Sequence, residues 1–261
     1  MLLKEKNAVI YGAGGAVGEA VAMAFASEGA RVFLVGRNIK PIIEISDRIK
    51  LAGGRAHIAR VDALNASEVE EHLSLVMSEY QKIDISFNLV SINDVQGIPL
   101  LELPSADFLS PVNTAMNTQF ITATAAARHM IKNKAGIILM LSANAAKKPT
   151  INSGGFGIAC AAIESLSRQL AKELGRFNIR VICLRSAGSP DAKGVSEALN
   201  SHAAARFLSR QEFEESFVKN TMLNRLPMLK EVANAAVIMA SGKASAITSA
   251  IVNVTCGELS D

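Results

Sequence analysis

The chain has 261 residues, 49% of them hydrophobic, and its 27 basic side chains stand against 24 acidic ones for a net charge of +3. A chain of this length and composition can bury one large core, so we expect a single domain over residues 1–261. The charges are spread along the sequence without a basic stripe, which argues against a nucleic-acid partner.

The sequence also favours a soluble protein of a reducing compartment. The N-terminal residues MLLKEKN are too few and too charged for a signal peptide. Outside the periodic helices, no run approaches the roughly 18 uncharged apolar residues of a membrane span. The three cysteines, Cys160, Cys183 and Cys256, lie far apart in apolar surroundings and lack metal-ligand spacing. We therefore expect free thiols, no metal, no membrane contact and a cytoplasmic location.

A glycine-rich turn follows the first predicted strand. Residues 8–10 form a continuous apolar run, as expected of a strand buried on both faces of a parallel sheet. The sequence YGAGGAVG then opens directly into an alanine-rich segment. Glycines allow positive φ angles, and their amides can approach a pyrophosphate at the start of the next helix. We interpret the stretch as a dinucleotide-binding turn, with a purely structural tight turn as the alternative.

A second predicted strand, Val32–Val35, ends at Gly36 and Arg37. Dinucleotide-binding folds place at this point the residue that meets the adenosine ribose. The second strand therefore supports the interpretation of the glycine-rich turn.

The remaining chain alternates predicted helices and strands with short connections. Ser67 and Glu70 form a capping-box pattern ahead of one helix. Residues 186–227 have few buried periodic positions and are expected to form a mobile substrate loop or lid. The alternation predicts an α/β fold, a doubly wound parallel β-sheet of about seven strands with helices on both faces. The other helices are predicted at Ile39–Leu51, Phe108–Lys132, Gly154–Phe177 and Lys230–Ser241, and the other strands at His57–Val61, Ile83–Val90, Gly136–Ser142, Ile179–Leu184 and Ala250–Val254.

Several stretches distributed over the chain carry a common resemblance. They are YGAGGAVG at 11–18, Asp62, Asn88, AARHM at 126–130, AAIESLSRQLAKELG at 161–175, IRV at 179–181 and ANAAVIMAS at 233–241. Together they resemble the short-chain dehydrogenase/reductase family. The resemblance implies a Rossmann-type domain that binds NAD(P)(H) and transfers hydride to or from an unknown carbonyl or alcohol. It also implies cofactor contacts from Gly12, Gly14, Gly15, Val17, Gly18, Arg37, Asp62, Ala63 and Asn88.

Arg37 sets the expected cofactor preference within this resemblance. It stands where NAD-selective relatives usually keep an acidic residue for the ribose 2′-hydroxyl. A guanidinium suits a 2′-phosphate through charge-assisted, bidentate hydrogen bonds. We therefore expect NADP(H) in preference to NAD(H), with Asp62 and Ala63 at the adenine. An exposed turn arginine and no bound cofactor are the alternative.

Other residues occupy the catalytic positions that the resemblance implies. Family members carry YxxxK on the helix after the fifth strand, and the equivalent positions here hold Phe156 and Cys160. The family serine falls on Ala143, beside Ser142. Phenylalanine has no proton to give to a carbonyl oxygen, and cysteine cannot replace an ammonium that holds the ribose. Both tyrosines of the chain lie elsewhere, so a register shift does not restore the motif.

Substitute proton donors are few, and each has a more ordinary role as a solvated loop residue, a helix contact or a core residue. The asparagine that family members carry on the long helix after the fourth strand falls near Ala115, between Asn113 and Asn117. The candidate substitute proton donors or orienting groups are Ser142, Ser153, Lys147, Lys148, His129, His202 and Cys160.

Two functions stay open on the sequence. One is an oxidoreductase with weak or altered catalysis, and the other is a non-catalytic cofactor sensor or oligomer subunit. The resemblance also implies a homodimer or homotetramer built through two long helices, at Ala115–Met130 and Ala159–Leu174. Their small residues would permit close approach of two subunits, namely Ala123, Ala125, Ala126, Ala127, Ala161 and Ala162.

Overall fold

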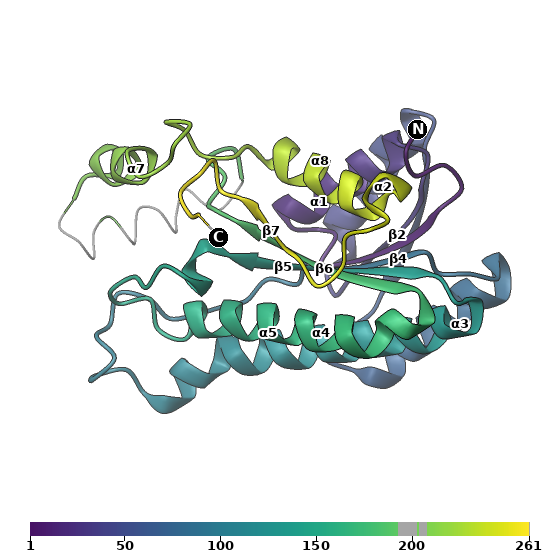
Figure 1. The fold of residues 1–261 in the computed structure, drawn as a ribbon, viewed down its shortest axis with the longest axis horizontal. Coiled ribbons are helices and arrows are strands. Elements are labelled where there is room, and N and C mark those ends of the chain that lie inside the picture. Colours follow the sequence, from purple (N-terminus) through teal and green to yellow (C-terminus); the bar gives the residue numbers. More distant parts are fainter. Residues whose placement is uncertain (193–202, 204–207, 261) are drawn as a thin grey trace.

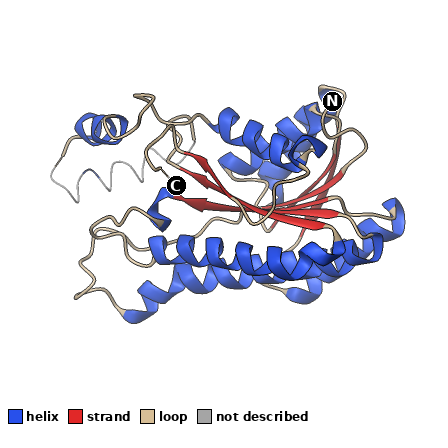
Figure 2. Cartoon of the chain, viewed as in Figure 1, coloured by secondary structure: helices blue, strands red, loops and turns tan. Residues whose placement is uncertain are grey.

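The computed structural model describes residues 1–192, 203 and 208–260, and it contains a seven-stranded parallel sheet of order β3-β2-β1-β4-β5-β6-β7. Figure 1 and Figure 2 show helices on both faces of this sheet, which confirms the predicted doubly wound fold. The strands are β1 (Asn7–Tyr11), β2 (Arg31–Gly36), β3 (Arg55–Arg60), β4 (Ile85–Asn88), β5 (Gly136–Ala143), β6 (Ile179–Ser186) and β7 (Ile251–Val254). The helices are α1 (Ala16–Ser27), α2 (Ile39–Leu51), α3 (Ala66–Tyr80), α4 (Ser105–Asn133), α5 (Phe156–Leu174), α7 (Arg210–Val218) and α8 (Leu229–Ala240).

The central strands are buried on both faces, as their continuous apolar runs predict. In β1, Val9 and Tyr11 pack with α3, α4 and α5, whereas Ala8 and Ile10 pack with α1, α2 and α8. In Figure 1, α4 and α5 lie along one face of the sheet and α1, α2 and α8 cover the other. Two hydrophobic cores therefore hold the sheet between them and fix the positions of its strand ends.

The glycine-rich turn lies where the strand order reverses. β1 pairs with β2 on one side and with β4 on the other. Gly12 has a φ of +71°, and a Cβ atom on it would lie 2.4 Å from the Leu89 carbonyl oxygen. A Cβ atom on Gly18 would lie 2.3 Å from the Gly12 carbonyl oxygen. Close backbone approach therefore requires glycine at both positions.

The predicted capping box at α3 is wrong. The N-cap is Asn65, whose side-chain oxygen accepts hydrogen bonds from the Ser67 and Glu68 amides at 3.1 and 3.3 Å. Ser67 is thus already inside the first helical turn, because the helix begins one residue earlier. Glu70 instead contacts Arg128 and His129 on α4.

The alanines expected to form a subunit interface on α4 are also misassigned. Ala123, Ala125, Ala126 and Ala127 are each at most 4% exposed and belong to the core between α4 and the sheet. Their small size serves close packing within one chain, so they are not available to a second subunit. On α5, Ala161 and Ala162 are half-buried.

The segment expected to be a lid is described only in part. β6 continues to Ser186, and α7 covers Arg210–Val218. The residues between Ala192 and Leu208, except Ala203, lie outside the described part of the chain, so the lid stays a prediction. Among the described helices, none combines the length and apolar character that crossing a bilayer requires.

Candidate functional site

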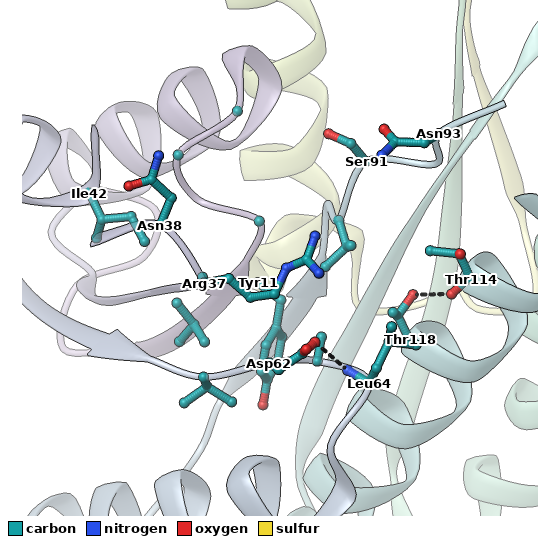
Figure 3. Close-up of a pocket in the computed structure, with 18 of the residues that line it drawn as sticks. Tyr11, Arg37, Asn38, Ile42, Asp62, Leu64, Ser91, Asn93, Thr114 and Thr118 are labelled. Carbon is teal, nitrogen blue, oxygen red and sulfur yellow. Dashed lines mark hydrogen bonds between the residues drawn. The ribbon is translucent and has the colours of Figure 1, made fainter. Parts of the chain in front are cut away.

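A cavity of about 500 Å³ opens at the carboxyl ends of β1, β2 and β3 (Figure 3). The glycine-rich turn, the loops after β2 and β3, the residues that follow β4 and one face of α4 surround it. The lining residues are Tyr11, Gly12, Gly14, Gly15, Val35, Gly36, Arg37, Asn38, Pro41, Ile42, Val61, Asp62, Ala63, Leu64, Val90, Ser91, Asn93, Ser110, Thr114 and Thr118. Doubly wound sheets bind nucleotides in this crevice, at the carboxyl ends beside the strand-order reversal.

The glycine-rich turn supplies one wall of the cavity. Gly12, Gly14 and Gly15 line it, as predicted for cofactor contacts. Gly15 is the N-cap of α1, and the first amides of a helix have no carbonyl partner within that helix. An anion here could accept from these amides and meet the positive end of the helix dipole. Val17 and Gly18 do not line the cavity, because they lie within α1 and Gly18 is buried against the turn.

Arg37 and Asp62 bring opposite charges into the cavity from the ends of β2 and β3. In Figure 3 the Arg37 side chain extends into the space between the labelled residues. Arg37 makes no hydrogen bond or ion pair with any described residue. One Asp62 carboxylate oxygen accepts from the Leu64 amide at 3.0 Å, and the Asp62 amide donates to Glu68 at 2.8 Å. The loop that presents Asp62 is thereby fixed, while the Arg37 guanidinium keeps its donors for a ligand.

Asn88 does not line the cavity, and its side chain instead makes hydrogen bonds within the protein. It is 3% exposed, its side-chain amide donates to the Thr122 hydroxyl at 3.0 Å, and its side-chain oxygen accepts from the Val90 amide at 2.9 Å. Asn88 therefore ties the end of β4 to α4 and orients Val90, which does line the cavity.

A buried ionic network lies under the ends of β5 and β6. Arg185 donates from Nε and Nη2 to the two carboxylate oxygens of Glu164, both at 2.7 Å. The Ser142 hydroxyl donates to the same carboxylate at 2.8 Å. All three residues are at most 5% exposed. Ser142 is therefore committed within the core, and its geometry does not support the expected role of orienting a carbonyl.

The three residues at the predicted catalytic positions carry no group that exchanges a proton near neutral pH. Phe156 is the first residue of α5, Cys160 follows one turn later, and Ala143 ends β5. Burial raises the pKa of the Cys160 thiol to about 12, so the thiol stays protonated and unreactive at neutral pH. None of the three lines the 500 Å³ cavity.

The loop candidates after β5 are held by other contacts. The Lys148 ammonium lies 2.8 Å from the carboxylate of Glu258, whose side chain is fully buried. Ser153 donates to a backbone carbonyl of its own loop at 2.8 Å. Lys147 is exposed and lines a separate pocket beside Glu164. His202 lies outside the described residues.

The helix candidates are structural as well. The Nε2 atom of His129 lies 2.7 Å from a carboxylate oxygen of Glu70, which joins α3 to α4. Ala115 is buried, and the Asn117 side chain donates to the Asn113 carbonyl within α4. Neither asparagine lines the cavity.

Sequence reasoning missed Glu164 and Arg185. Each is a charged residue in an otherwise apolar periodic position, Arg185 within the strand ICLRS and Glu164 on the buried face of α5. A charge at a core position predicts an ion-pair partner, and that signal was available in the sequence.

The sheet topology, the glycine-rich turn and the cavity beside it define an α/β protein of the Rossmann type. A family model described as enoyl-(acyl carrier protein) reductase matches residues 12–258, nearly the whole chain. The chain therefore belongs to the short-chain dehydrogenase/reductase family, as its sequence motifs predict.

Named relatives agree with this assignment. The 7alpha-hydroxysteroid dehydrogenase of Escherichia coli (strain K12) is 29% identical over 255 residues, which cover 98% of this chain and 94% of that protein. The structure of NAD+-bound xylitol dehydrogenase is similar with a TM-score of 0.92 at 21% identity, over 98% of this chain and 100% of that one. The structure of YwfH, an NADPH dependent reductase involved in bacilysin biosynthesis, is similar with a TM-score of 0.88 at 19% identity. The match covers 99% of this chain and 100% of that one.

Proposed function

We propose that this protein binds a nicotinamide dinucleotide, NADP(H) in preference to NAD(H), and is an oxidoreductase with weak or altered activity on a carbonyl or alcohol. The observation that carries the cofactor preference is the Arg37 guanidinium, which lines the cavity without a partner among the described residues. A 2′-phosphate would supply that partner through charge-assisted hydrogen bonds. The relatives named above use NAD+ and NADPH, so the preference rests on Arg37 alone.

The proposed adenosine contacts follow from the same cavity. Asp62 and Ala63 line it beside Arg37 and are assigned to the adenine. Gly14 and Gly15, at the start of α1, are assigned to the pyrophosphate. A cytoplasmic location remains part of the proposal.

The weak or altered catalysis follows from Ala143, Phe156 and Cys160. Carbonyl reduction needs a proton at the oxygen as hydride reaches the carbon, and general acid catalysis contributes about 10² to 10⁴ in rate. A phenyl ring has no proton to give, and a buried thiol whose pKa is raised to about 12 is a poor general acid at neutral pH. The same residues favour the second candidate function, a non-catalytic cofactor sensor or oligomer subunit.

Calorimetric titration with NADPH and NADH tests the binding proposal. We expect NADPH to bind about 10- to 100-fold more tightly, which corresponds to one or two hydrogen bonds to a charged group. Arg37→Ala should abolish this difference. Arg60→Ala is the matched control, because Arg60 is exposed at the end of β3 and does not line the cavity. Equal affinities in the wild type, or an unchanged ratio in Arg37→Ala, would refute the proposed preference.

NADPH oxidation with reactive dicarbonyls and quinones tests the catalytic part. We expect turnover at least about 10²-fold below that of a relative with an intact proton donor, assayed in parallel. Turnover at the level of that relative would show that a proton donor has been missed. Binding without detectable turnover would favour the sensor or subunit role.

A further inference from the structure

A second cavity, of about 490 Å³, opens between α5 and the edge strands β6 and β7. It shares no described residue with the 500 Å³ cavity at the glycine-rich turn. Four parts of the chain line it, with Lys147 after β5, Glu164 and Arg168 on α5, Arg185 on β6 and Ile251 on β7. Sites for small molecules commonly have volumes of about 300–1,000 Å³. The second cavity is therefore large enough for a compact ligand of its own.

The charged side chains that line this second cavity are mostly cationic. Among the described residues, Lys147, Arg168 and Arg185 carry three positive charges and Glu164 carries one negative charge, which leaves a net charge of +2. The Glu164 carboxylate accepts hydrogen bonds from Arg185 and Ser142, so its oxygens are directed to partners within the protein. The lining therefore favours an anion.

The cations lie at different depths and are held differently. Arg185 is 1% exposed and is fixed by its two hydrogen bonds to Glu164, so it lies at the inner end of the cavity. Lys147 and Arg168 are exposed and therefore lie at its opening. Arg168 makes no hydrogen bond or ion pair with any described residue. The half-buried side chain of Ile251 adds an apolar part to the wall.

From these observations we propose that the second cavity binds a small organic dianion, a phosphate monoester or a dicarboxylate. Two negative charges balance the net charge of the lining, whereas one would leave a cation uncompensated. The Arg168 guanidinium donates paired, charge-assisted hydrogen bonds to the anionic oxygens, and the compact carbon body packs against Ile251. The site is separate from the proposed nucleotide site, so both ligands can be bound at once.

Calorimetry at pH 8 and constant ionic strength tests this inference with glycerol 3-phosphate, succinate and acetate. At this pH the first two carry about two negative charges each and acetate carries one. We expect at least one dianion to bind about tenfold or more tightly than acetate, and the tighter of the two identifies the anionic group. Arg168→Ala should weaken the dianion about tenfold, as expected for a lost hydrogen bond to a charged group.

Two further variants show where the dianion binds. Lys172→Ala is the matched control, because it removes a positive charge one turn further along α5 from an exposed residue that does not line the cavity, and should change the affinity less than about twofold. Arg37→Ala should leave the affinity unchanged, because Arg37 lines only the nucleotide cavity. The inference is wrong if no dianion binds, if acetate binds as tightly, or if Arg168→Ala and Lys172→Ala weaken binding equally. Loss of binding in Arg37→Ala but not in Arg168→Ala would place the anion in the nucleotide cavity and overturn the inference as well.

Discussion

His72 is a histidine of α3 that the hydrophobic core keeps neutral. Its side chain is 9% exposed and meets the Phe33 ring edge-on at 6.4 Å between centroids, and its Nδ1 atom has no partner. Burial lowers the pKa of His72 from 6.5 to about 4. Below pH 6.5 the unfolded chain takes up a proton that folded His72 takes up only near pH 4. The free energy of unfolding therefore decreases as the pH falls through this interval.

This residue gives a pH prediction. Between pH 7 and pH 5, the wild type should lose about 2 kcal/mol more stability than His72→Leu, since each unit of pKa shift corresponds to about 1.4 kcal/mol. Urea denaturation of both proteins at the two pH values measures the difference. An equal loss of unfolding free energy in the two proteins would mean that folding does not lower the pKa of His72.

Glu164 and Arg185 join three elements, because Ser142 on β5 and Arg185 on β6 both meet the carboxylate presented by α5. The guanidinium and the carboxylate form two hydrogen bonds, and both residues are almost fully buried. Such a pair costs desolvation energy and contributes little net stability, but removing one partner leaves an uncompensated buried charge.

We therefore expect Arg185→Met to lower the free energy of unfolding by about 3–5 kcal/mol, and the double variant Arg185→Met/Glu164→Met to recover most of this loss. Urea denaturation at pH 7 measures both. The control is Arg225→Met, which removes an equally bidentate pair with Glu231 at the surface and should cost less than about 1 kcal/mol. A cost for Arg185→Met no larger than that of the control would contradict the network's role.

At the scale of the whole molecule, α4 and α5 present an outward face that no other described element covers (Figure 1). Phe120 on α4 is 56% exposed and Ile158 on α5 is 48% exposed, whereas the alanines of α4 point into the core. Exposed aromatic and aliphatic residues on adjacent helices are typical of subunit contacts. If the protein forms the proposed homodimer or homotetramer, Phe120 rather than the alanines is the contact residue to change.

The assembly prediction is that light scattering at micromolar concentration gives a dimer or tetramer for the wild type, and that Phe120→Glu gives the 27.6 kDa monomer. A buried carboxylate without a partner is costly at an interface, which is the reason for dissociation. Leu75→Glu is the control, because Leu75 is 68% exposed on α3, a helix outside the α4 and α5 pair, and the change should leave the assembly intact. A monomeric wild type would refute the proposal.

The sequence by itself determined the fold class, the glycine-rich turn and the strand ends that carry Arg37 and Asp62. These features depend on local periodicity and on residues a few positions apart, whose geometry a strand or helix fixes directly. The resemblance of its motifs likewise sufficed to predict the family. The start of α3 shows the limit of this reasoning, because a boundary shift of two residues exchanges Ser67 for Asn65 as the N-cap.

Only the tertiary structure decided which polar side chains remain for a ligand. Ser142 and Glu164 are 22 residues apart, and Asp191 and Leu229 are 38 apart, so no local pattern predicts that each pair meets. The sheet order places β5 beside β6 with α5 across both, and this arrangement turns Ser142 and Arg185 inward, away from the crevice. The same packing buries the alanines of α4 against the sheet. Arg37 keeps its donors for the opposite reason, since it follows a strand end and forms no hydrogen bond or ion pair with any described residue.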